Sequence, residues 1–289
     1  MTAADIAYRL GDARREGCGW RCRCPLHGGR SLVLRDGDGG RLLATCWAGC
    51  NRLDVIAELR RRSLLDDRAD RVHNETANAI RQIDHLAERN GRLALEIWNS
   101  ARDVCGTLAA QYLARRKLVL PEGVSGRAIR FHPACPFGGS RHPTMIGLFR
   151  AIVNNEPRAI HRTALTLDGD KLGRKMLGRK SGTAIKLTAD EDVTTSIAIG
   201  EGIESTLGGM LLGFVPAWAV GDVCGIACFP VLSGIETLTI FVDRDVSGTG
   251  QRRAIECSRR WTKAGRQVFR VVPIKEGADL ADIIVGRAA

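Results

Sequence analysis

The first fifty residues contain five of the chain's ten cysteines and a histidine, and this cluster constrains the fold more than any other feature of the sequence. Cys24 and His27 are separated by two residues, Cys46 and Cys50 by three, and eighteen residues lie between the two pairs. Two such pairs, joined by a β-hairpin, can converge on one tetrahedral ion, and Zn²⁺ accepts a mixture of thiolate and imidazole ligands. We therefore expect these four residues to bind a structural zinc ion.

The surrounding sequence predicts a small zinc-ribbon-like module over residues 1–62. Apolar runs at Ser31–Leu34 and Arg41–Ala44 flank a segment rich in glycine and aspartate, which predicts two strands joined by a turn at 35–40. A helix is expected after the last cysteine from the helical spacing of Leu53, Ile56, Ala57 and Leu59. A module of this size buries little core, so a bound metal would supply much of its folding energy.

Other interpretations of the cysteines remain open at this point. Cys22 is an alternative to Cys24 as a ligand, and Cys18 is a less favourable one. Ordinary buried thiols would not need the paired spacing, and a redox site is disfavoured because no Cys-x-x-Cys pair opens a helix. Farther along the chain, Cys224 and Cys228 lie in an apolar stretch, and we expect them to be buried structural thiols.

The last third of the chain, residues 191–289, alternates apolar segments with helical patterns. The expected strands are Ser196–Gly200, Ala217–Val220, Leu238–Val242 and Val268–Val272, and the expected helices span Ser205–Leu212 and Arg252–Trp261. Nearly continuous apolar strands separated by helices are typical of a buried parallel sheet. This region is therefore predicted to be an α/β domain with a parallel central sheet.

Acidic residues follow three of these strands. Glu201 comes directly after the first, Asp243 and Asp245 end the third, and Asp279 and Asp282 follow the last. Ligands of parallel sheets bind beyond the carboxyl ends of the strands, so these carboxylates are expected to converge. A carboxylate cluster repels itself unless cations occupy it, and oxygen ligands favour Mg²⁺ or Mn²⁺. The alternative for each single motif is a helix or turn cap.

Two further regions lie between these ends, which makes the predicted fold a multi-domain α/β chain. Residues 63–117 hold no proline and only two glycines, and they read as a helical connector broken near Asn90-Gly91. Its apolar stripe consists of Ile80, Ile83, Leu86, Leu93, Leu95 and Trp98. Residues 118–190 read as a small basic, mixed α/β unit with strands at Ala128–Phe131, Thr144–Phe149 and Ala159–Thr163.

The charge balance points to a polyanionic partner. Lysine and arginine number 43 against 32 acids, a net charge of +11, which favours nucleic acid; general solubility is the competing explanation. A basic segment, expected to be a flexible loop that binds nucleotide or template phosphates, contains Lys171, Arg174, Lys175, Arg179 and Lys180. A merely solvated loop is the alternative, and Arg162 is a second phosphate candidate. The segment is not a phosphate-binding P-loop, because Arg179 separates Gly178 from Lys180 and no apolar strand precedes it.

Membrane and secreted proteins are disfavoured. No segment approaches the roughly 18 uninterrupted apolar residues of a membrane span, and the N-terminus lacks the apolar region of a secretory signal. We therefore expect a cytoplasmic protein that does not bind membranes. In that reducing compartment ten cysteines are not expected to form a disulfide framework.

Together these motifs resemble known families. Glu201-Gly after a strand, then Asp243-x-Asp-x-x-Gly, then Gly277-x-Asp-x-x-Asp resemble the Toprim domain of topoisomerases, primases and some nucleases, over about residues 193–285. Cys-Pro-x-His followed by Cys-x-x-x-Cys is similar to the CHC2-like zinc-binding domain of bacterial-type DNA primases. The middle of the chain resembles Toprim-containing primase-like proteins of plasmids, phages and integrated elements at Tyr112–Arg116, Arg130–Pro133, His161–Thr163 and Lys175–Gly178.

The resemblance implies a function. It makes Glu201, Asp243 and Asp245 the catalytic and metal-binding acids, with Asp279 and Asp282 as accessory magnesium ligands. The implied enzyme is a DNA primase, a DNA-directed RNA polymerase that makes short primers on single-stranded DNA from nucleoside triphosphates, with a separate helicase or replication initiator as a further partner. A Toprim-type metal-dependent nuclease and a non-catalytic single-stranded DNA-binding replication accessory are the alternatives.

Overall fold

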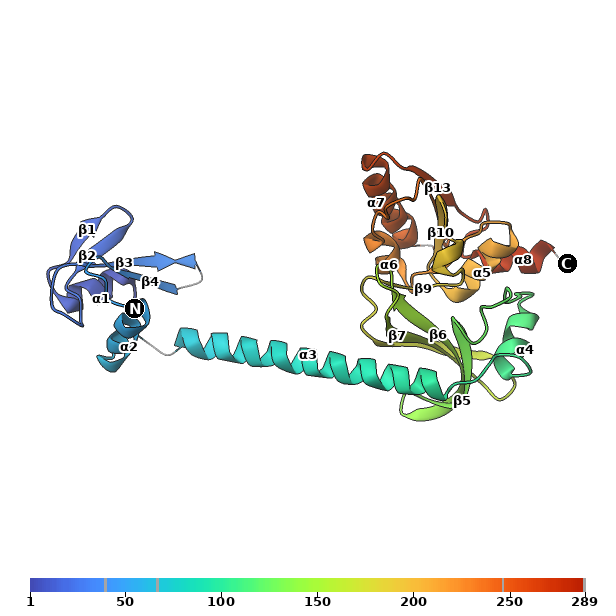
Figure 1. Ribbon diagram of the computed structural model, residues 1–289, viewed down its shortest axis with the longest axis horizontal. Helices are drawn as coiled ribbons and strands as arrows, with labels where there is room; N and C mark the ends of the chain where they lie inside the picture. Colours follow the sequence, from blue (N-terminus) through green and yellow to red (C-terminus); the bar gives the residue numbers. More distant parts are fainter. Residues whose placement is uncertain (39–40, 66–67, 246, 288–289) are drawn as a thin grey trace. The chain divides into compact units, whose positions relative to one another are not determined.

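The computed structural model describes residues 1–38, 41–65, 68–245 and 247–287, without the side chains of residues 68–83 and 287. The chain divides into two compact units, Met1–Asp84 and His85–Ala289 (Figure 1). Among the described helices, none is both long and apolar enough to cross a bilayer.

The first unit is a four-stranded antiparallel sheet with two helices. Its elements are α1 (Ala3–Leu10), β1 (Arg14–Glu16), β2 (Gly19–Cys22), β3 (Leu32–Gly37), β4 (Arg41–Cys46) and α2 (Arg52–Arg61). The expected hairpin is confirmed, because β3 pairs antiparallel with β4 from Leu32↔Cys46 to Gly37↔Arg41. Residues 39–40 of the expected turn lie outside the described residues. The core is small, and its fully buried side chains include Ile6, Leu32, Leu34 and Leu59.

Helix α3 (Arg68–Ser100) runs without the predicted break at Asn90-Gly91, so that prediction was wrong. A single glycine costs a helix only about 1 kcal/mol, which neighbouring turns and packing offset. Among the members of the predicted apolar stripe whose side chains are described, burial is complete only near the end of the helix. Trp98 is buried, Leu86 and Leu93 are exposed, and the side chains of Ile80 and Ile83 lie outside the described ones.

The second unit is built on one mixed nine-stranded sheet in the order β13-β12-β10-β11-β9-β6-β7-β8, with β5 paired to β6. The strands are β5 (Ile129–Phe137), β6 (Ser140–Ala151), β7 (Pro157–Leu165), β8 (Lys171–Gly178), β9 (Thr183–Ile185), β10 (Ser196–Gly200), β11 (Ala217–Ala219), β12 (Thr237–Phe241) and β13 (Gln267–Val271). Strands β10, β11, β12 and β13 pair in parallel, as expected, and all other pairs are antiparallel.

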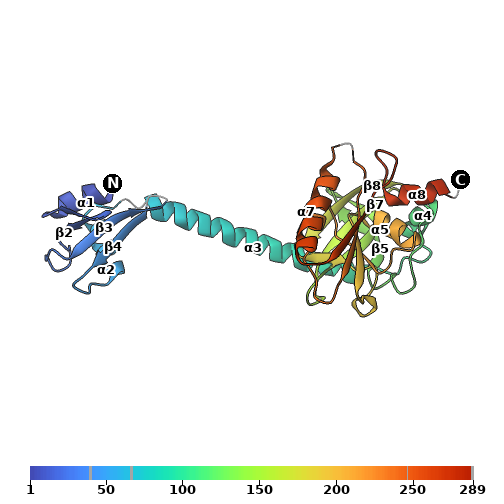
Figure 2. The same ribbon diagram turned by 90° about the horizontal axis from the view of Figure 1, so that it is seen from above.

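Helices cover both faces of this sheet (Figure 2). They are α4 (Leu108–Arg115), α5 (Ile203–Leu211), α6 (Val223–Cys228), α7 (Thr249–Lys263) and α8 (Leu280–Arg287), with a 3-10 turn η2 at Asp190–Asp192. Residues of α4 and α5 share one buried cluster, and residues of α6 and α7 share another, in which Trp261 stacks on Phe229 at 6.0 Å. Two glycines bring α5 close to its neighbours: a Cβ at Gly208 would lie 2.7 Å from the Leu280 backbone, and one at Gly209 would lie 2.3 Å from the Phe241 ring.

Two expectations about the second unit were wrong. The basic segment is not a loop, because Lys171–Gly178 forms β8 and pairs with β7 in the register Arg162↔Lys175. β8 ends the sheet, and edge strands tolerate lysine and arginine because one side of them faces solvent. Cys224 and Cys228 are exposed on the short helix α6 rather than buried.

The uninterrupted course of α3 yields a stability prediction. We expect Gly91→Ala to stabilise the protein by about 0.5–1 kcal/mol, because alanine favours a helix interior over glycine. Outside the backbone of α3, the nearest described atom to a Cβ at position 91 would be the Arg158 carbonyl oxygen, at an ordinary contact distance of 3.9 Å. Chemical denaturation followed by circular dichroism measures the change. As a contrasting variant, Gly208→Ala should destabilise the protein, since its Cβ meets backbone. A destabilising Gly91→Ala would contradict the continuous helix.

Candidate functional site

In the first unit, Cys24, His27, Cys46 and Cys50 come together as the sequence predicts. Their ligand atoms all lie within 4.8 Å of one another. His27 Nε2 lies 3.2 Å from Cys46 Sγ, and the Sγ atoms of Cys24 and Cys50 are 3.9 Å apart. Tetrahedral zinc with Zn–S bonds of about 2.3 Å places its sulfur ligands about 3.8 Å apart. The donor set and its spacing therefore fit a zinc ion.

The local structure explains why these residues meet. Antiparallel pairing of β3 with β4 brings Cys46, the last residue of β4, opposite Leu32 and beside the turn that holds His27. Burial raises the pKa of Cys46, but hydrogen bonds from Ser31 and His27 outweigh it and lower the pKa to about 6. A low pKa provides the thiolate that a metal requires. Cys22 is buried and Cys18 exposed, and neither belongs to the group.

In the second unit, the acids follow three strands that lie side by side. β10 pairs in parallel with β12, and β12 pairs in parallel with β13, so their carboxyl ends share one edge of the sheet. Glu201, Asp243 and Asp279 come after these three strands in turn. With Asp245 and Asp282, these acids are called the acidic edge below. Their oxygens are not drawn as tightly together as the zinc ligands, since the cysteine and histidine group is the only one of its kind within 4.8 Å among the described residues.

The electrostatics of this edge indicate a shortage of positive charge. Burial, together with the carboxylates of Glu201 and Asp279, raises the pKa of Asp243 to about 6, although Ser205 donates a hydrogen bond of 2.8 Å to its Oδ1. Asp245 Oδ2 accepts hydrogen bonds from Ser247 and from the backbone of Gly250, whereas its Oδ1 is buried and has no partner among the described residues. A divalent cation would offset the repulsion around Asp243 and would give the Oδ1 atom of Asp245 a partner. The acids therefore fit Mg²⁺ or Mn²⁺.

Asp279 and Asp282 form a reciprocal cap at the start of α8. The backbone N–H of Asp279 donates to Asp282 Oδ2 at 3.0 Å, and that of Asp282 donates to Asp279 Oδ1 at 2.9 Å. Burial raises the pKa of Asp279. Arg116 lies within 3.6 Å of both carboxylates. Arg116 was not among the predicted site residues, although the motif Tyr112–Arg116 offered the signal.

Two cations of β8 contact acids of the Toprim-like region. Arg174 donates to Glu201 Oε1 at 2.8 Å, next to the acidic edge. Lys171 donates to Glu204 Oε1 at 2.8 Å, and so does the Tyr112 hydroxyl. Burial raises the pKa of Glu204, but the Lys171 ammonium and these hydrogen bonds outweigh it and lower the pKa to about 2. Sequence reasoning missed Glu204, which lies three residues after Glu201.

The remaining predicted phosphate ligands lie elsewhere. Arg162 is buried and donates to the carbonyl oxygens of Pro136 and Met176. Lys175 lies over the Phe137 ring, with its Nζ 5.1 Å from the centroid. Lys180 pairs with Asp222 at 2.5 Å, and Arg179 is exposed. The five cations of the basic segment therefore do not form one phosphate-binding loop.

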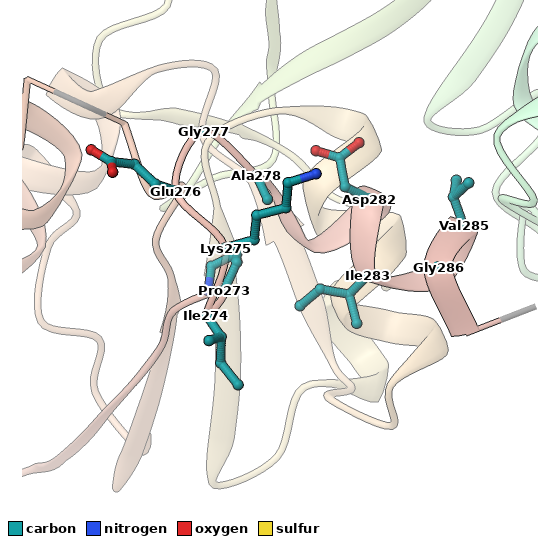
Figure 3. A pocket seen from close by; sticks show the side chains of 10 residues that line it. All are labelled: Pro273, Ile274, Lys275, Glu276, Gly277, Ala278, Asp282, Ile283, Val285 and Gly286. Carbon is teal, nitrogen blue, oxygen red and sulfur yellow. The ribbon is translucent and has the colours of Figure 1, made fainter. Parts of the chain in front are cut away.

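A cavity of about 650 Å³ lies beside the α8 cap. Figure 3 shows Ile274 and Lys275, from the loop after β13, opposite Ile283 and Val285 of α8, with the Asp282 carboxylate at its rim. The cavity is largely apolar and borders the acidic edge rather than forming part of it.

Comparison with protein families divides the second unit in two. Residues 88–187 match a domain of unknown function, DUF7146. Residues 196–289 match the Toprim domain, and the three acidic motifs lie within that range. Residues 196–289 are a Toprim domain. The Toprim domain thus supplies β10 to β13, and the DUF7146 segment supplies β5 to β9 and α4. No curated protein matches the sequence.

Solved structures show the fold. The zinc-binding and RNA polymerase domains of the Aquifex aeolicus primase match with a TM-score of 0.50 and 13% identity, over 99% of this chain and 80% of that one. The Escherichia coli primase catalytic core matches with a TM-score of 0.47 and 16% identity, over 70% of this chain and 76% of that one. The first match confirms that the chain has the fold of a bacterial primase with a zinc-binding module, as expected from the sequence.

The cysteine group can be tested by metal analysis. We expect about one zinc ion per chain, lost in Cys46→Ser because three ligands hold Zn²⁺ far more weakly than four. Loss of the metal should unfold the first unit and leave the second folded. Elemental analysis and circular dichroism measure both effects. Cys18→Ser is the matched control and should keep its zinc, while full zinc in Cys46→Ser would refute the assignment.

The role of Lys171 can be tested by stability. We expect Lys171→Met to cost about 3 kcal/mol, the lower end of the range for breaking a buried ion pair, because the lysine side chain is 31% exposed. Lys175→Met is the matched control on the same strand and should change stability by less than about 1 kcal/mol. Urea denaturation distinguishes the two. Equal effects would mean that Lys171 does not compensate Glu204.

Proposed function

We propose that this protein is a DNA primase, which makes short primers on single-stranded DNA by metal-dependent nucleotidyl transfer. The observation that carries the proposal is the row of carboxylates after β10, β12 and β13 of the Toprim domain, with Asp243 held at a pKa of about 6 by burial and by its acidic neighbours. Two further features support it: the primase fold and the zinc-type cysteine group, which occur in one chain with this site.

The acids would hold the catalytic metal ions. Glu201, Asp243 and Asp245 supply the oxygens, and Asp279 lies close enough to Asp243 to raise its pKa. Bound Mg²⁺ or Mn²⁺ would activate the primer 3′-hydroxyl and stabilise the pyrophosphate leaving group. Ser205 fixes the Asp243 carboxylate by its hydrogen bond of 2.8 Å, so that this group is oriented before substrate binds.

Arg174 and Arg116 would bind phosphate groups of the substrate. Each guanidinium lies against acids of the edge, Arg174 on Glu201 and Arg116 on Asp279 and Asp282. When cations neutralise those acids, the guanidiniums are free to pair with the triphosphate of an incoming nucleotide, because arginine binds phosphate oxygens in a bidentate manner. Lys171 has a different role, since it compensates the buried Glu204.

The reaction requires a template, substrates and protein partners. The template is single-stranded DNA and the substrates are nucleoside triphosphates, with zinc as the structural metal of the first unit. We expect the protein to act in the cytoplasm beside a separate helicase or replication initiator. Two solved structures that align with this chain are described as a primase catalytic domain bound to single-stranded DNA and as primase domains bound to an RNA/DNA hybrid.

Two substitutions test the chemistry. We expect Glu201→Gln and Asp243→Asn each to reduce primer synthesis at least a hundredfold, because removing one anion weakens or misplaces the metal. Both should bind single-stranded DNA within a few-fold of wild type. The measurement combines protein, single-stranded DNA, labelled nucleoside triphosphates and Mg²⁺, and it counts new oligonucleotides.

The controls separate the alternatives. Asp168→Asn and Glu236→Gln change exposed acids outside the edge and should leave synthesis unchanged. Shortened template in the wild type would indicate a nuclease, and binding without any reaction would indicate a DNA-binding accessory. Synthesis that survives in both edge variants would mean that the active site lies elsewhere.

A further inference from the structure

The tip of the β5–β6 hairpin forms a hollow away from the acidic edge. The strands are joined at Gly138 and Gly139, both with positive φ, and the turn lies beside β7 and β8. The hollow has a volume of about 340 Å³. It is lined by Pro136, Phe137, Gly138, Gly139, Ser140, Arg141 and Arg162.

An aromatic ring with cations around it forms one wall. Lys175 Nζ and Arg162 Cζ lie 5.1 Å and 5.9 Å from the centroid of the Phe137 ring, and the His142 ring meets that ring edge-on at 6.3 Å. Arg162 is held in place, because it donates to the Pro136 carbonyl oxygen at 2.7 Å and to that of Met176 at 3.3 Å. The wall is therefore built before any ligand arrives.

The cations here have no acidic partner in the described part of the chain. Among the residues that the structure describes, no carboxylate pairs with Arg141, Arg162 or Lys175, and the Arg162 Nε is buried without an acceptor. Lys171 and Arg174 differ, since each contacts a glutamate. Arg141 and Arg162 line the hollow, and Lys175 lies beside it over the Phe137 ring. Arg141 and Arg162 donate to uncharged backbone carbonyl oxygens, so the positive charge of all three cations makes an anion-binding surface.

The hollow lies on the opposite face of the sheet from the acidic edge. Arg162 and Lys175 stand opposite each other in the β7–β8 register, and side chains of neighbouring residues point to the other face. On that other face, Arg174 reaches Glu201. Ile160, two residues before Arg162, packs against α3 near Trp98. The hollow is thus separate from the site where metal ions would bind.

We propose that this hairpin site, formed by Phe137, Arg141, Arg162 and Lys175, binds single-stranded DNA. Phe137 stacks on one unpaired base, and the three cations contact the phosphates on either side. Aromatic stacking with flanking cations is sequence-tolerant and suits an unpaired strand better than a duplex, whose bases are already stacked. The choice of DNA as the strand rests on the proposed function, whereas the stacking geometry does not.

The ring is tested by binding. The probe is a twelve-nucleotide single strand that carries 2-aminopurine, whose emission responds to stacking. We expect Phe137→Leu to weaken binding about tenfold and to abolish the change in emission, because leucine offers no aromatic face on which a base can stack. Phe137→Tyr should restore both. Phe269→Leu, at an exposed phenylalanine of β13, is the matched control and should bind like wild type.

The charge is tested by salt. We expect Arg141→Gln to weaken binding and to reduce the dependence of log affinity on log salt by about 0.7, the contribution of one phosphate contact on a single strand. Arg259→Gln changes an exposed arginine of α7 and should leave that slope unchanged. An RNA strand of the same sequence is measured in parallel, and tighter binding of RNA than of DNA would overturn the choice of DNA.

The outcomes distinguish this proposal from the proposed function. If wild type makes primers but Phe137→Leu binds DNA normally and wild type leaves the probe's emission unchanged, the hairpin site is refuted and the primase is not. If Phe137→Leu and Arg141→Gln weaken binding but no primers form, the hairpin site stands and the primase fails. Thermal denaturation checks that the variants fold. If Phe137→Leu does not fold, an unchanged emission of the probe on binding to wild type still refutes the hairpin site.

Discussion

The parallel pairing of β10, β12 and β13 is the constraint on which the candidate chemistry depends. Parallel strands end at the same edge, so residues separated by some forty positions in the chain become neighbours without any long-range contact of their own. The close packing of α5, which Gly208 and Gly209 permit, keeps Ser205 within reach of Asp243. Sheet order and helix packing together gather the acids, although mutual repulsion opposes it.

Buried and half-buried charges then determine much of the surrounding structure. Glu204 is almost fully buried and is compensated by Lys171 and Tyr112. Arg174 forms an ion pair with Glu201, and Arg116 forms one with Asp282. These contacts join the DUF7146 segment to the Toprim domain, and the antiparallel pairing of β9 with β11 makes one continuous sheet of the two. Removing one partner of such a buried pair is strongly destabilising, because it leaves the other charge buried without compensation.

The two units differ in how much apolar core they bury. The second unit buries large apolar clusters on both faces of its sheet. The first unit has one small cluster, in which Cys22 and Cys24 are themselves buried members. Its four metal-type ligands lie at the end of the β3–β4 hairpin, where a bound ion would tie the strands to α2. Metal binding and folding would then be a single event in that unit.

The local sequence pattern was sufficient to predict those parts of the protein that are recognised by the spacing of a few nearby residues. The paired cysteines, the apolar strands of the Toprim domain and the acids directly after them are all short-range features, and each keeps its meaning wherever the segment packs. The sequence therefore determined the cysteine group and the row of acids.

Only the tertiary structure decided which charged side chains pair with one another inside the fold and which remain at its surface. The basic segment became the edge strand β8, because β7 offered it backbone hydrogen bonds that no local pattern could reveal. Strand alternation then sent Arg174 to the acidic edge and Lys175 to the opposite face, beside Phe137. The Tyr112–Glu204 contact joins residues 92 positions apart. Long-range pairing of this kind depends on the whole sheet, which is why the charges of adjacent residues acquired different roles.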